Sequence, residues 1–105
     1  MAADQDLHRY ELQARLKQIC DNVYFDPPEN IRMSYPCVVY ERSRGDHQYS
    51  NDKTYVFTNG YSLTVISANP DDSLRYQLIN DFPKMRFDRH YVADGLHHDV
   101  FTLYY

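Results

Sequence analysis

Apolar residues recur along this chain at two periods, one typical of helices and one typical of strands. Residues 4–20 show the helical period, with apolar side chains three and four positions apart, and so predict an amphipathic helix. Asp4 or Asp6 can cap its start and lies near the positive end of the helix dipole. We expect its inward stripe to consist of Leu12, Leu16, Ile19 and Cys20, continued by Leu7 and Tyr10.

A second helix is indicated after the sequence Asn-Pro-Asp-Asp at residues 69–72. Asn69 suits the capping position and Pro70 suits the first helical position, with the two aspartates near the positive helix end. We expect the helix to run from Pro70 to Asn80 and to end before Pro83. Its inward residues are predicted to be Leu74, Leu78 and Ile79, with Phe82 just beyond.

Between the two helices, the pattern changes to that of strands. Residues 23–25 form a short apolar piece that the prolines at 27–28 separate from a loop. Residues 37–42 begin with apolar side chains on both faces, which favours a central strand. Residues 54–67 give the longest strand signal, interrupted by Asn-Gly at 59–60, which is either a tight hairpin turn or a bulge. We favour one long bent strand that pairs with residues 37–42.

Polar residues at 43–53 connect these two strands and contain Gly45. They are interpreted either as a long hairpin loop or as a pair of protruding strand ends. A solvated tip and a protrusion towards a partner or a channel are equally good interpretations, because long loops in small domains often carry function.

The last strands form a predicted hairpin about Asp94-Gly95, which is a strong signal for a two-residue turn. Such a turn sets Ala93 opposite Leu96 and His90 opposite Asp99. Alternation then divides the hairpin into two faces. One face is predicted to carry Asp88, His90, Val92, His97, Asp99 and Phe101; the other carries Arg89, Tyr91, Ala93, Leu96, His98, Val100 and Thr102.

Together these elements predict the order α-β-β-α-β-β and the α+β class. We expect a four- to five-stranded, mostly antiparallel sheet with two helices packed on it. The length of 105 residues fits a single domain over residues 1–105.

Composition narrows the possible functions. The chain has a net charge of −4, from 11 basic and 15 acidic residues, and its basic residues are scattered, which argues against sequence-independent nucleic-acid binding. No apolar run resembles a secretory signal or a membrane span, so we expect a cytoplasmic site of synthesis and no membrane contact. Cys20 and Cys37 fall on apolar positions and are expected to be buried free thiols. Eleven tyrosines without a tryptophan indicate protein–protein contact.

The sequence contains few combinations of residues that could bind a metal or catalyse a reaction. The face with Asp88, His90, His97 and Asp99 could bind zinc or nickel, although a solvated face with a His90–Asp99 pair is the more ordinary interpretation. No combination of nucleophile, base and orienting group emerges, so we expect no enzymatic activity, no metal and no cofactor.

Three runs of residues carry a family resemblance that covers about four-fifths of the chain. They are NVYFDPPENIRMSYPCVVYERS at 22–43, YSLTVIS at 61–67 and FDRHYVADGLHHDVFTLYY at 87–105. The chain resembles a family of small proteins of long-tailed phages, described as tail terminator or tail completion proteins. The resemblance implies a sheet flanked by helices and no catalytic residues.

The resemblance further implies a six-membered ring at the head-proximal end of the tail tube. Such a ring stops tube polymerisation, contacts the major tail tube protein and the head–tail connector or stopper, and lets genomic DNA pass without specific binding. The expected location is the virion, at the head–tail junction, after assembly in the host cytoplasm. Another neck or head–tail joining protein, and a small His/Asp metal-binding domain, are the alternatives. We expect subunit or tube contacts at Arg44, Asp46, Tyr49, Tyr55, His90, His97 and Asp99.

Overall fold

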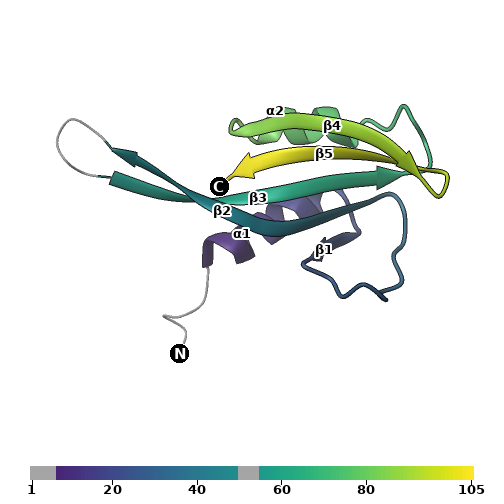
Figure 1. Ribbon diagram of the computed structural model, residues 1–105, viewed down its shortest axis with the longest axis horizontal. Coiled ribbons are helices and arrows are strands. Elements are labelled where there is room, and N and C mark those ends of the chain that lie inside the picture. The colour runs from purple at the N-terminus through teal and green to yellow at the C-terminus, as the bar shows by residue number, and fades with distance from the viewer. Residues whose placement is uncertain (1–6, 50–54) are drawn as a thin grey trace.

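The computed structural model describes residues 7–49 and 55–105, apart from the side chains of residues 44–49 and 55–58. It confirms the α+β class, with two helices and five strands (Figure 1). The predicted order lacked one strand, because an apolar piece of three residues is too short to show a period. In chain order the elements are α1 (Leu7–Ile19), β1 (Val23–Phe25), β2 (Cys37–Tyr49), β3 (Tyr55–Ser67), α2 (Leu74–Asp81), β4 (Met85–Ala93) and β5 (Leu96–Tyr104).

The strands form one mixed sheet in the order β1-β2-β3-β5-β4. β1 runs parallel to β2, and the other neighbours are antiparallel. β5 therefore lies between β3 and β4, and β4 forms one edge of the sheet.

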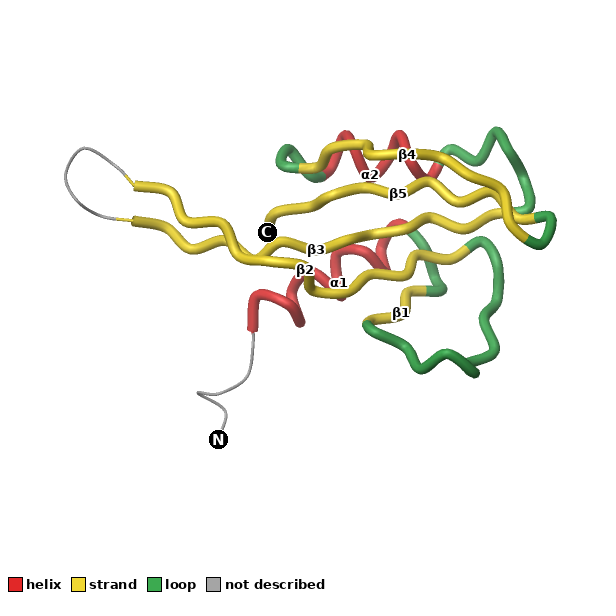
Figure 2. Tube along the Cα trace, viewed as in Figure 1, coloured by secondary structure: helices red, strands yellow, loops and turns green. Residues whose placement is uncertain are grey.

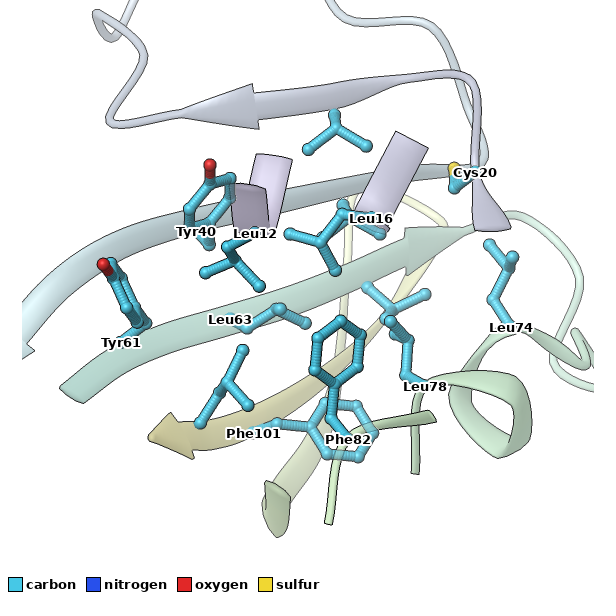
Figure 3. Close-up of a cluster of buried hydrophobic side chains, with 14 residues drawn as sticks. Leu12, Leu16, Cys20, Tyr40, Tyr61, Leu63, Leu74, Leu78, Phe82 and Phe101 are labelled. Atoms are coloured by element: carbon cyan, nitrogen blue, oxygen red, sulfur yellow. The ribbon is translucent and has the colours of Figure 1, made fainter. Parts of the chain in front are cut away.

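Both helices pack on the same face of this sheet. Alternate residues of β2 and β3, among them Tyr40 and Leu63, are fully buried against Leu12 and Leu16 of α1. α2 adds Leu78 to the same cluster, and Figure 3 shows these side chains gathered over the strands. A two-residue period on the strands and a four-residue period on the helices thus meet in one core.

The inward stripe of α1 is narrower than the sequence pattern predicts. Leu12, Leu16 and Cys20 are buried, but Leu7 and Tyr10 are 67% and 50% exposed. Tyr10 lies about 200° around the helix from Leu12, since each residue adds about 100°. Asp4 and Asp6, the predicted caps, lie outside the described residues.

Polar side chains of α1 fasten the helix to its surroundings. The Tyr40 hydroxyl donates to Oε1 of Gln13, and the Tyr105 hydroxyl donates to Oε1 of Glu11 at 2.6 Å. Arg15 donates to the carbonyl oxygen of Asp81 at 2.8 Å, which links α1 to the end of α2. The polar side of this helix therefore also makes contacts within the fold, to the sheet and to the end of α2.

α2 begins later than the Asn-Pro-Asp-Asp sequence predicts. Asn69 Oδ1 accepts the N–H of Asp71 at 3.0 Å, which forms a turn before the helix. The first helical N–H, that of Leu74, donates to Oδ1 of Asp72 at 2.9 Å. Ser67 Oγ donates to Oδ2 of the same aspartate at 3.0 Å, so Asp72 joins the end of β3 to the start of α2.

The inward face of α2 follows a spacing of four, with Leu74, Leu78 and Phe82 buried. Ile79 was predicted to face inward as well, but it is 44% exposed. It lies about 100° around the helix from Leu78 and so falls beside the buried stripe.

The long strand predicted over residues 54–67 is confirmed in β3. Its pairing with β2 shows where the ladder is irregular. Arg42 lies opposite Tyr61, but the next pair is Gly45 with Asn59, so β2 carries an extra residue opposite Gly60. The bulge expected at Asn59-Gly60 therefore has its extra residue on the partner strand. Residues 43–49 are strand rather than loop, which confirms the protruding strand ends.

Replacing Asp72 tests the start of α2. We expect Asp72→Ala to lower the free energy of unfolding by about 1 kcal/mol, because the N–H of Leu74 and the hydroxyl of Ser67 both lose their acceptor. Asp72→Asn keeps an oxygen at the same place and should lose less. Urea unfolding followed by circular dichroism measures both; equal losses would contradict the capping role.

Cys20 and Cys37 are free and buried, as the sequence predicts. Burial raises the pKa of Cys37 from 9.0 to about 12 and also raises the pKa of Cys20. At mildly alkaline pH the Cys37 thiolate should therefore be about a thousandfold scarcer in the folded protein than in the unfolded chain.

Alkylation by iodoacetamide, followed by mass spectrometry, checks this expectation. Both cysteines should react slowly in the native protein and rapidly in denaturant. Native labelling of Cys37 at the rate of the unfolded chain would show that the site is open.

Candidate functional site

Beyond the body of the sheet, β2 and β3 continue as a two-stranded arm, which we define as residues 45–49 and 55–59. β5 pairs with β3 only from Gly60 onward, and the N–H of Tyr105 reaches the carbonyl oxygen of Asn59 at the base of the arm. Beyond Asn59, the described strands of the arm pair with each other. Figure 2 shows the arm extending from one end of the sheet, and the molecule measures 50 × 32 × 22 Å. Isolated two-stranded hairpins are marginally stable in water. The arm is therefore well placed to be stabilised by a partner.

The predicted contact residues divide into two groups. Asp46, Tyr49 and Tyr55 lie on the arm, with Tyr49 opposite Tyr55, and Arg44 lies at the bulge where the arm begins. The side chains of these four residues lie outside the described part of the structure. The second group, on β4 and β5, lies towards the opposite end of the sheet (Figure 1). The sequence alone could not show that the two groups are apart.

The second group consists of His90, His97 and Asp99, and it gathers as the hairpin register predicts. His90 lies opposite Asp99, and its Nδ1 is 2.8 Å from Oδ1 of the carboxylate. Nε2 of His90 is 3.4 Å from Nδ1 of His97, and the two rings are stacked with centroids 5.4 Å apart. Arg75 of α2 lies 3.6 Å from the other carboxylate oxygen of Asp99. The Asp99 side chain, only 11% exposed, is thus held between an imidazole and a guanidinium.

Asp88 does not join this group, which corrects the predicted hairpin face. The register of β4 and β5 shifts between Phe87 and Arg89, so Asp88 is an extra residue in β4. Asp88 instead accepts a hydrogen bond from Thr102 on the other face. Phe87 takes the predicted place, with its ring 5.5 Å from that of Phe101 and inclined by 72°.

Beside the group lies a groove of about 430 Å³ between α2 and the β4–β5 hairpin. Phe87 and Phe101 form the sheet side, and Tyr76 and Ile79 form the helix side. The sequence pattern placed Ile79 in the core and did not single out Tyr76, because both lie beside the buried stripe of α2. Arg75 and Ile79 are four residues apart, a spacing that marks one helix face and could have indicated them.

The arrangement offers little chemistry of its own. Both ring nitrogens of His90 already face partners, and the described residues contain no group of three or more His, Cys, Asp or Glu that could hold a metal. The described lining of the groove contains no serine, threonine or cysteine that could act as a nucleophile. The groove is best suited to contact through its apolar walls.

Comparison with protein-family models, with curated proteins and with solved structures finds no match to this chain in any of the three. In the part of the chain that the structure describes, no helix is long and apolar enough to cross a membrane.

The role of Asp99 can be tested by substitution. Asp99→Ala should lower the free energy of unfolding by about 1 kcal/mol, because the contacts of its buried carboxylate with His90 and Arg75 are lost, although both partners are partly exposed and can bind water instead. Glu41→Ala, at an exposed position of β2, should cost about 0.5 kcal/mol or less. Chemical unfolding of both variants measures the difference, and similar losses would show that Asp99 has no special role.

Proposed function

We propose that this protein is an assembly protein, which acts by contact with copies of itself and with other proteins. The β2–β3 arm is the observation that carries the proposal. It extends two strands beyond the last residue of β5, and in the described part of the structure no third strand pairs with them there. A chain with 11 tyrosines has the composition expected of a surface that a partner covers.

Within that class, we propose a tail terminator or tail completion protein of a long-tailed phage. The support is the resemblance of residues 22–43, 61–67 and 87–105 to that family. In this role the subunits form a ring at the head-proximal end of the tail tube, where they stop the addition of tube subunits and contact the connector. The net charge of −4 is compatible with a ring that lets DNA pass without holding it.

Tail tubes grown from the major tail protein of the same phage provide the test. Added protein should shorten the tubes and form a ring at one tube end, as seen by negative-stain electron microscopy. Binding to a connector without any effect on tube growth would favour another neck protein. A protein that leaves the tubes and the connector unbound would contradict the proposal.

Removing the arm costs the body of the sheet the Gly60–Tyr104 pair and the hydrogen bond from the N–H of Tyr105 to the carbonyl oxygen of Asn59, both at the end of β5. We expect a variant in which a short turn joins Arg42 to Tyr61 to keep its helices and most of its thermal stability, since this pair precedes the bulge. The same variant should no longer bind tubes. The substitutions Tyr49→Ala and Asp46→Ala within the arm should weaken binding and leave the fold intact.

Gln77→Ala, at an exposed position of α2, serves as the control and should bind tubes normally. Full binding by the armless variant would place the contact elsewhere, and its unfolding would show that the arm supports the body.

A further inference from the structure

β4 forms an edge of the sheet whose outer side has no neighbouring strand in the described structure. All of its residues except the first and the last are exposed. Among them, Phe87, Tyr91 and Val92 are 49%, 40% and 56% exposed although their side chains are largely apolar. An edge strand with unpaired backbone groups is a template for pairing with another strand.

Backbone directions along β4 follow from its pairing with β5. The N–H of Tyr104 donates to the carbonyl oxygen of Lys84 at 3.1 Å, so the backbone of Tyr104 faces the β4 side. Directions alternate along a strand, and β5 pairs with β3 without a shift, so Thr102 and Val100 also face β4. The β4 residues opposite Phe101 and Asp99 must then direct their backbone groups outward. On each side of the extra residue Asp88, two residues do so, namely Met85 and Phe87 before it and His90 and Val92 after it.

Because of the extra residue, the residues whose backbone groups point away from β5 have odd numbers before Asp88 and even numbers after it. A regular strand would keep them all odd or all even. β4 can therefore pair antiparallel with a second β4 over its length when the two-fold axis lies between Asp88 and Arg89. Outward residues then meet outward residues, in the pairs Met85 with Val92 and Phe87 with His90.

Side-chain faces agree with this register. Phe87 and His90 lie on the helix side of the sheet, where they contact Phe101 and Asp99. On the other side, Tyr91 stacks on His98 with centroids 4.6 Å apart, and Asp88 contacts Thr102. Each pair of the register thus brings together residues of one face, including Arg86 with Tyr91 and Asp88 with Arg89.

Charge complementarity is strongest at the axis. Asp88 of each copy faces Arg89 of the other, so symmetry makes two opposite-charge pairs. Further out, Arg86 faces the exposed ring of Tyr91, and Met85 faces Val92. Bulges and charges on an edge strand normally discourage pairing between edges. At this position both favour one partner, which is an identical strand.

We propose that β4 binds β4 of a second copy of this chain, forming a two-fold dimer with a continuous sheet. The inference does not rest on the tail role, because it concerns the edge of the free protein. The contact lies at the β4 edge of the sheet, opposite to the edge formed by β1, and leaves the arm free to bind other partners. It also gives His90 a place in a subunit contact, opposite Phe87 of the second copy.

Charge reversal tests the register. Sedimentation velocity of the full chain should show a dimer, and Asp88→Arg or Arg89→Asp alone should raise its Kd by about tenfold or more, since like charges then meet twice. The two single variants mixed together should form a heterodimer, because each arginine then faces an aspartate. The double variant D88R/R89D should dimerise like the unchanged protein.

A disulfide provides a second measurement that does not depend on charge. The double variant Arg86→Cys/Tyr91→Cys should form a covalent dimer on mild oxidation, whereas Arg86→Cys alone should not, because position 86 does not face itself. The proposal is overturned if the unchanged protein stays monomeric at high concentration. It is equally overturned if the single charge variants dimerise normally, if their mixture stays monomeric, or if both cysteine variants cross-link alike.

Discussion

The pairing of β5 between β3 and β4 determines the rest of this structure. β5 supplies Phe101 and Leu103 to the core beneath the helices, and it brings Asp99 to the groove beside α2. It also sets the limit of the sheet body, because its pairing with β3 stops at Gly60. Everything that β2 and β3 extend beyond that limit becomes the arm. One strand thus contributes to the core and sets the point beyond which β2 and β3 pair with each other without a third described strand.

The sequence was most informative where a local rule and a buried face agree. The Asp94-Gly95 turn has positive φ at both residues, which the two-residue hairpin requires, and the predicted pairs from Ala93–Leu96 to His90–Asp99 are all present. Burial of both cysteines and of Leu12 and Leu16 follows the apolar period equally well. At these positions the tertiary packing agrees with the conformation and burial that the local sequence predicts.

Prediction failed where the face on which a side chain lies depends on its exact position along a strand or helix. Asp88 is an extra residue, so Phe87 replaced it on the groove face, and nothing in the local composition indicates that shift. Ile79 and Tyr10 were placed inward by counting apolar residues rather than angles, although each lies off the buried stripe. The groove itself joins α2 to β4 and β5, and such a contact depends on tertiary packing, which a single sequence does not specify.

The strand order also has a consequence for synthesis. β5 is made after β3 and β4, although its place in the sheet is between them. Until β5 leaves the ribosome, β3 lacks its second neighbour, and β4, whose neighbour in the described sheet is β5, has no strand to pair with. Pairing of β3 with β5 also closes a long loop, which slows folding. Before β5 emerges, the unpaired edges of β3 and β4 can therefore pair with other chains, which favours aggregation.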